Sequence, residues 1–124
     1  MKQKVQTTST GSDHLLSQAI TSNGFVFVSG QIHVDGQMKL VGETTREKVT
    51  QIMANIVEVL KSANVSLDDI VKVVIYVTDM SVMPELNEIY PSFFTGVLPA
   101  REAICVAALP LGASIEISVI AEEN

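Results

Sequence analysis

The strongest constraint on the fold is one amphipathic helix that separates two groups of strand-like segments. Residues 44–47 read Thr-Thr-Arg-Glu, a capping box in which a hydroxyl is followed three residues later by an acid. Asn64 offers a cap at the other end, after a helix reaching about Ala63. Its apolar stripe recurs at three- and four-residue spacing and comprises Val49, Ile52, Met53, Ile56, Val57 and Leu60.

The segments before this helix have β character. Residues 3–9, 17–21 and 25–29 predict three short strands. Asn23-Gly24 joins the last two, and Asn-Gly is a strong hairpin signal because both turn positions need positive φ. Asp35-Gly36 repeats this chemistry and predicts a second tight turn.

A central strand and a second helix follow. Residues 66–69 predict a capped turn, and residues 70–78 are β-branched or apolar at nearly every position, as expected for a central strand. A second helix should begin near residues 81–84 and end before Gly96. Pro91 falls inside its apolar pattern, which predicts either a kink or a helix that starts late enough to keep this proline in its first turns.

Two further strands, at residues 101–108 and 114–122, complete the order β-β-β-α-β-α-β-β, and a Pro110–Gly112 turn joins them. With no repeat and no linker in 124 residues, we expect a single α+β domain spanning 1–124. Both helices should cover one face of the sheet, which leaves the other face bare. Because the strands are apolar, we expect copies of the chain to associate through that face.

Composition narrows the function. Hydrophobic residues make up 47% of the chain, enough for a core, and a net charge of -6 without a basic run makes nucleic acid a poor candidate partner. A single cysteine, Cys105, excludes an internal disulfide framework and fits a reducing compartment. We therefore expect a cytoplasmic protein, since no segment resembles a signal peptide or a membrane span.

Two charged residues stand out in the small and apolar stretch from Leu98 to Glu116, which has the composition of an interior strand. Arg101 opens it and Glu116 closes it. Such groups are costly to bury unless they are paired, so together they suggest a pocket for a small anion. Alternatively, the two residues pair with each other, or their charges reach solvent at strand ends.

Other candidates are weaker. Ser29-Gly30-Gln31 ends a strand, where glycine either lets a ligand approach the backbone or marks a bulge. Cys105 is in phase with Arg101 and favours a small core residue over a nucleophile. His14 and His33 lack the paired spacing of metal ligands, and there is no phosphate-binding glycine loop, so we expect no metal and no cofactor.

Four segments together resemble the reactive intermediate deaminase (Rid) family, also called YjgF-type and often labelled L-PSP endoribonuclease or translation inhibitor. Their order and spacing match over nearly the whole chain. They are Ser17-Gln-Ala19; Phe27-Val-Ser-Gly-Gln-Ile32; Asn87-Glu-Ile-Tyr90 with Phe93-Phe94; and Pro99-Ala-Arg101 followed by Leu109-Pro110 and Ile115-Glu-Ile117.

The resemblance implies a chorismate-mutase-like fold, a mixed sheet with two helices on one face, and a homotrimer with ligand clefts between subunits. It also implies roles for site residues. Arg101 matches the arginine that grips a substrate carboxylate, Glu116 the acid that holds or activates water, and Asn87 a polar residue at the cleft, while Ser29 and Gly30 match a strand end that lines it. Active members hydrolyse 2-imino acids or their enamine tautomers to 2-keto acids and ammonia, without a cofactor.

Two positions depart from the deaminase branch of that family. Leu16 stands where a tyrosine is usual, and Ala103 stands where a cysteine is usual. The leading interpretation is an imine deaminase, and the alternative is a trimeric protein that binds or senses a small carboxylate without turnover. Ribonuclease or translation-inhibitor activity is disfavoured by the acidic charge and by the lack of a plausible histidine pair. These motifs leave the natural ligand and the subgroup open.

Overall fold

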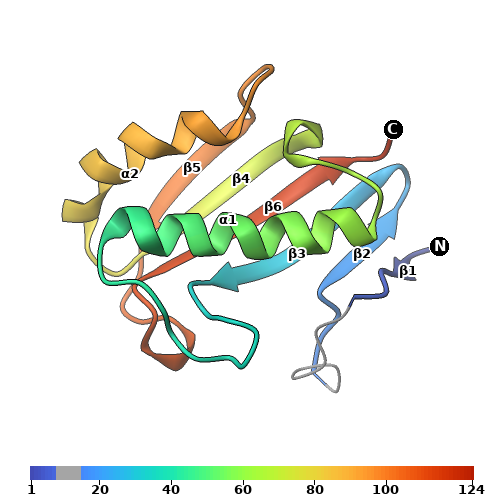
Figure 1. Ribbon diagram of the computed structural model, residues 1–124. Coiled ribbons are helices and arrows are strands. Elements are labelled where there is room, and N and C mark those ends of the chain that lie inside the picture. Colours follow the sequence, from blue (N-terminus) through green and yellow to red (C-terminus); the bar gives the residue numbers. More distant parts are fainter. Residues whose placement is uncertain (8–14) are drawn as a thin grey trace.

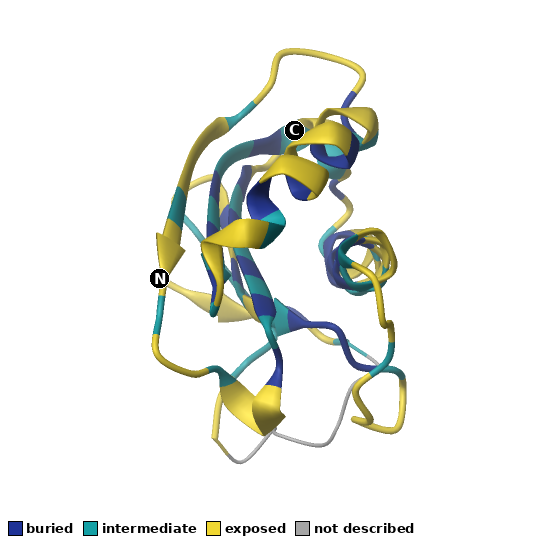
Figure 2. Ribbon diagram, turned by 90° about the vertical axis from the view of Figure 1, so that its left-hand side faces the viewer, coloured by how far each residue is buried: buried dark blue, intermediate teal, exposed yellow. Residues whose placement is uncertain are grey.

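The computed structural model describes residues 1–7 and 15–124 of the chain. A six-stranded mixed sheet carries two helices on one side (Figures 1 and 2). The strands are β1 (Gln3–Lys4), β2 (Ala19–Ser22), β3 (Phe25–Ile32), β4 (Ile70–Val77), β5 (Ala100–Cys105) and β6 (Ile115–Glu122). The helices are α1 (Thr45–Ser62) and α2 (Met83–Ile89), with 3-10 turns η1 (Leu67–Asp69), η2 (Met80–Val82), η3 (Tyr90–Phe93) and η4 (Pro110–Gly112). The α+β fold and the order β-β-β-α-β-α-β-β are therefore confirmed.

The strands pair in the order β1-β2-β3-β6-β4-β5. Only β4 and β5 pair in parallel; all other pairings in the described chain are antiparallel. This order makes β4 a central strand, as its composition predicts, and places β5 at an edge. The prediction that residues 101–108 form interior strand is wrong, because β5 pairs on one side only and most of its residues are exposed (Figure 2).

The predicted caps and turns form as the sequence indicates. Thr44 and Glu47 make the capping box at the start of α1: the Glu47 N–H donates to the Thr44 hydroxyl and the Thr44 N–H donates to the Glu47 carboxylate, both at 3.1 Å. Asn23 and Gly24 have φ of 52° and 83° in the β2–β3 turn. The strand expected over residues 3–9 is only β1, and its last two residues lie outside the described part, as does His14.

The core lies between the helices and the sheet. Helix α1 contributes Val49, Ile52, Met53, Ile56, Val59 and Leu60, whereas Val57 is only half-buried. Pro91 lies in the first turn of η3, directly after α2 ends at Ile89. A proline there removes no helical hydrogen bond, so the second of the two expected arrangements is the one observed. In the described residues no helix has the length and apolar character needed to cross a membrane.

Strand β3 contains a bulge at Ser29 and Gly30. Val28 pairs with Val119, but the next registered partner of β6 is Ile117, which pairs with Gln31. Three steps along β3 thus match two along β6, so β3 carries one extra residue. The bulge interrupts the pairing of β3 with β6, which resumes at Gln31 and Ile32.

Within one copy of the chain, the described residues leave the face of the sheet opposite the helices uncovered (Figure 2). Phe25, Phe27 and Ile104 lie on it and are 40%, 43% and 40% exposed. They alternate with core residues, so their side chains must point away from the helices. This surface, the bare face, has the apolar character expected of a self-association surface.

Candidate functional site

Glu116 and Gly30 fit together on the bare face. Glu116 lies between Ile115 and Ile117, which are both fully buried beneath the helices, so its own side chain projects from the other side of the sheet. Its carboxylate occupies the space beside Gly30. A Cβ added to Gly30 would lie 2.1 Å from Oε2 and 2.8 Å from Cδ of Glu116. Glycine is therefore the residue that lets this carboxylate lie against the bulge.

The Glu116 carboxylate has no compensating partner in the described chain: no hydrogen bond or ion pair reaches it from residues 1–7 or 15–124. Partial burial raises the pKa of Glu116 above its ordinary value near 4.5. A carboxyl group with a raised pKa can both accept and donate a proton nearer to neutral pH. The arrangement therefore suits acid–base chemistry better than structural pairing.

Hydrogen bonds hold the bulge beneath this carboxylate. The Ser29 hydroxyl donates to the Ser17 carbonyl at 2.7 Å, and the Ser29 N–H donates to the Gln18 carbonyl at 2.9 Å. The Gln31 amide donates to the Ser29 carbonyl at 3.0 Å. Leu16 directly precedes this anchored segment and is 42% exposed. Ser29, Gly30 and Glu116 are thus brought together, with Leu16 at the end of the neighbouring segment.

Arg101 belongs to a second group, on the helix side of the sheet. It pairs in register with the buried Val73, and its guanidinium lies over the Tyr90 ring, 5.0 Å from the ring centroid. Asn87 lies three residues before Tyr90, close to one helical turn, and is exposed. Ala103 lies on the same side of β5 as Arg101 and packs against the core. No described acid pairs with Arg101.

Within one chain the two groups do not meet. Arg101 and Glu116 project from opposite sides of the sheet, on strands that β4 separates. The alternative in which Arg101 and Glu116 pair with each other is therefore wrong within one chain. Of the candidate residues, Arg101, Asn87 and Ala103 thus form one group, and Glu116, Ser29, Gly30 and Leu16 form the other.

Sequence reasoning missed the contact between Tyr90 and Arg101 and misplaced Cys105. The helical spacing identified Tyr90 as a core residue, which it is, but not its contact with Arg101. The three-residue spacing of Asn87 and Tyr90 was the available signal, since residues at this spacing are neighbours on a helix surface. Cys105 was predicted to be a small core residue, but it is exposed at the end of the edge strand β5.

His33 has a structural environment. It is buried, with Nδ1 3.0 Å from the Val41 carbonyl oxygen, and Nε2 accepts a 3.1 Å hydrogen bond from the Ser114 N–H. Both ring nitrogens are thus occupied. Desolvation lowers the pKa of His33 below 6.5. Among the described residues no group of three or more histidine, cysteine, aspartate or glutamate side chains could hold a metal ion.

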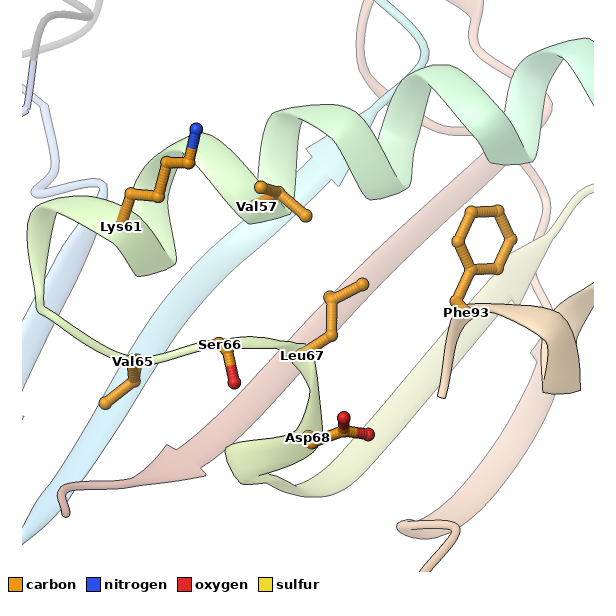
Figure 3. A pocket seen from close by; sticks show the side chains of 7 residues that line it. All are labelled: Val57, Lys61, Val65, Ser66, Leu67, Asp68 and Phe93. Carbon is orange, nitrogen blue, oxygen red and sulfur yellow. The ribbon is translucent and has the colours of Figure 1, made fainter. Parts of the chain in front are cut away.

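A separate groove of about 320 Å³ lies on the helix side, and none of the candidate residues lines it. Its walls come from α1, from the segment that follows α1 and from η3 (Figure 3). The polar groups in these walls are already paired. Asp68 accepts hydrogen bonds from the hydroxyl and N–H of Thr95 and from the Gly96 N–H, and Lys61 lies 3.8 Å from Glu58. The groove therefore offers little polar recognition.

Known proteins match this chain over most of its length. A RutC family protein of Aquifex aeolicus is 43% identical over 107 residues, which cover 85% of this chain and 86% of that protein. The mouse 2-iminobutanoate/2-iminopropanoate deaminase is 39% identical, over 87% of this chain and 81% of its own. The crystal structure of yeast Mmf1 superposes with a TM-score of 0.94 at 38% identity and covers 100% of both chains.

The family profile described as Endoribonuclease L-PSP matches residues 8–123. This match, the relatives and the shared fold agree with the resemblance that the sequence motifs indicate. The chain belongs to the Endoribonuclease L-PSP family, which is the Rid or YjgF family.

Proposed function

We propose that this protein hydrolyses 2-imino acids, or their enamine tautomers, to 2-keto acids and ammonia. The observation that carries the proposal is the Glu116 carboxylate, which has no partner among the described residues. Its pKa is raised, and it fits only because residue 30 is glycine. Family membership supports the same reaction, since relatives include proteins named as imine deaminases.

The single cysteine also fits a reducing compartment, and we propose a cytoplasmic location.

In the proposed reaction, Arg101 binds the substrate carboxylate with two parallel N–H donors, a geometry that lysine cannot copy. Glu116 accepts a proton from water as the water oxygen bonds to the imine carbon. The carboxyl group then returns that proton to nitrogen, which gives a carbinolamine. Glu116 next carries the proton of the new hydroxyl group to the amine, the C–N bond breaks, and ammonia leaves as the carbonyl forms. One water is consumed for each ammonia released, so no cofactor is required.

We further propose that two copies of the chain complete each site. Because Arg101 and Glu116 project from opposite sides of one sheet, the β5 edge of one copy must meet the bare face of another to bring them together. Three copies around an axis, with their bare faces inward, would also cover Phe25, Phe27 and Ile104. Sedimentation should give about 40 kDa, three times 13.4 kDa, and a stable 13.4 kDa species would contradict this assembly.

Within that cleft, we propose that Asn87 and Ala103 lie beside the anchored carboxylate and that Ser29, Gly30 and Leu16 lie beside Glu116. The alternative is a trimer that binds or senses a small carboxylate without turnover. Leu16 and Ala103 favour this alternative, because the deaminase branch usually has tyrosine and cysteine at these positions.

A coupled assay tests the proposal. Threonine dehydratase or an amino-acid oxidase generates the imine, and semicarbazide traps what the protein does not hydrolyse. The wild type should reduce trapped imine in proportion to its concentration. Absence of acceleration over solvent hydrolysis for every imino acid tested would favour the binding alternative.

Replacement of the proposed anchor provides a second test. Arg101→Lys should weaken binding of 2-ketobutyrate by about 1.5–3 kcal/mol, because a charge-assisted two-pronged contact is lost. Arg46→Lys at the start of α1 is a matched control that should leave the affinity unchanged. Equal affinity in the wild type and Arg101→Lys would show that Arg101 is not the anchor.

A further inference from the structure

We infer that Tyr90 is a positioning residue that holds the Arg101 guanidinium in place for carboxylate binding. This inference rests on the proposed role of Arg101. The guanidinium carbon lies 5.0 Å from the Tyr90 ring centroid, within the range of a cation–π contact. The contact joins η3 to the edge strand β5, the next element along the chain, so the packing of η3 beside β5 defines the position of this side chain.

The protein core holds the Tyr90 ring in one position. Tyr90 is only 4% exposed and is the first residue of η3, directly after α2. The Phe94 ring packs against it, with centroids 5.2 Å apart and planes inclined by 55°. A ring held in the core in this way has few conformations, whereas a free arginine side chain has many. Contact with the ring therefore restricts the rotamers of Arg101.

The chemistry of the contact matters as much as its rigidity. An acidic partner would occupy the guanidinium N–H donors that a substrate carboxylate needs. A ring face attracts the same charge without accepting those hydrogen bonds, which leaves them for the ligand. In the described chain, Arg101 has no ion pair, consistent with an arginine kept available.

The ring, rather than the hydroxyl, supplies this function. The Tyr90 hydroxyl is buried and has no hydrogen-bond partner among the described residues. Phenylalanine would keep the ring face and remove only that unpaired group. Tyr90→Phe should therefore retain the positioning of Arg101, and Tyr90→Leu should lose it.

The experiment compares Tyr90→Leu and Tyr90→Phe with Phe94→Leu. Phe94→Leu removes a ring from the same buried cluster without removing the ring under Arg101. Two quantities are measured at equal oligomer size: the affinity for 2-ketobutyrate by calorimetry, and the ring-current shift of the Arg101 Nε–H proton by NMR. Tyr90→Leu should weaken binding about 3- to 10-fold and abolish the ring-current shift. Tyr90→Phe and Phe94→Leu should retain both.

The results separate this inference from the proposed function. The ring-current shift requires neither binding nor turnover, so it tests the contact even if the wild type neither binds 2-ketobutyrate nor hydrolyses imines. An unchanged shift in Tyr90→Leu would overturn the inference. So would equal loss of affinity in Tyr90→Leu and Phe94→Leu, which would show a packing effect. Loss of affinity in Tyr90→Phe would assign the function to the hydroxyl instead.

Discussion

The contact between Gly30 and Glu116 predicts that one added methyl group will separate catalysis from stability. In Gly30→Ala the new Cβ would lie 2.1 Å from Glu116 Oε2, 2.8 Å from Cδ and 3.2 Å from Cγ. Ordinary contact needs at least about 3.4 Å, so the carboxylate must move by more than 1 Å. The displaced atoms are the end of a flexible side chain, and the fold can accommodate that movement.

The expected effects differ in size. A catalytic group displaced by about 1 Å typically costs on the order of 100-fold in rate, so turnover in Gly30→Ala should fall by roughly that factor. The free energy of unfolding should change little. Alanine restricts the unfolded chain by about 0.4–1 kcal/mol in favour of folding, which offsets part of the cost of moving the carboxylate. Affinity for 2-ketobutyrate should persist, because Arg101 is unaffected.

Three measurements test this prediction: imine hydrolysis in the coupled assay, urea unfolding, and the pKa of Glu116 by NMR. Displacement towards solvent should lower that pKa towards 4.5. Gly36→Ala is the matched control, since a Cβ at Gly36 meets nothing within 4 Å. Wild-type turnover and an unshifted Glu116 pKa in Gly30→Ala would refute the reasoning.

Three further predictions concern buried polar groups. Glu116→Gln should slow imine hydrolysis by about 10²–10⁴-fold while binding of 2-ketobutyrate persists. Because burial raises the pKa of Glu116, ionisation of this group destabilises the fold as pH rises. The variant should therefore be more stable than the wild type at pH 7 and should lose this advantage below pH 4.5. Burial lowers the pKa of His33, so the free energy of unfolding of the wild type should fall as pH drops below 6.5. In urea unfolding, His33→Gln should show a weaker dependence of this free energy on pH below 6.5. Tyr90→Phe should raise the free energy of unfolding by up to about 1 kcal/mol, because it removes a buried hydroxyl without a described partner. A decrease of the free energy of unfolding by more than about 1 kcal/mol would show that this hydroxyl has a partner in solution.

Local sequence signals predicted the fold well because they act within a few residues. The capping box at Thr44 and Glu47, the Asn23-Gly24 turn and the apolar strand from Ile70 each fix structure through nearby atoms. The position of β5 is different. Its small and apolar residues suit an interior strand, but whether a strand lies at an edge depends on which other strands are available to pair with it.

The site was predictable only in part, for the same reason. Motifs identified Arg101 and Glu116, and alternation along each strand gives the side on which each side chain lies relative to its neighbours. Alternation cannot relate one strand to another, so the sequence could not show that these two residues project from opposite sides of the sheet. The contact of Tyr90 with Arg101 likewise depends on how η3 packs beside β5.

The bulge constrains the number of residues in β3, because an insertion or deletion there would alter how this strand pairs with β6. Beyond the extra residue, Ile32 pairs with Glu116 and therefore shares its side of the sheet. Ile32 there joins a second small apolar cluster with Val34 and Ala113, separate from the main core. Deletion of Gly30 would remove the extra residue and leave Ile32 opposite Glu116. It would also remove the bulged backbone against which the Glu116 carboxylate lies. Relatives that share this arrangement should therefore keep both the extra residue in this strand and a glycine at the position of Gly30.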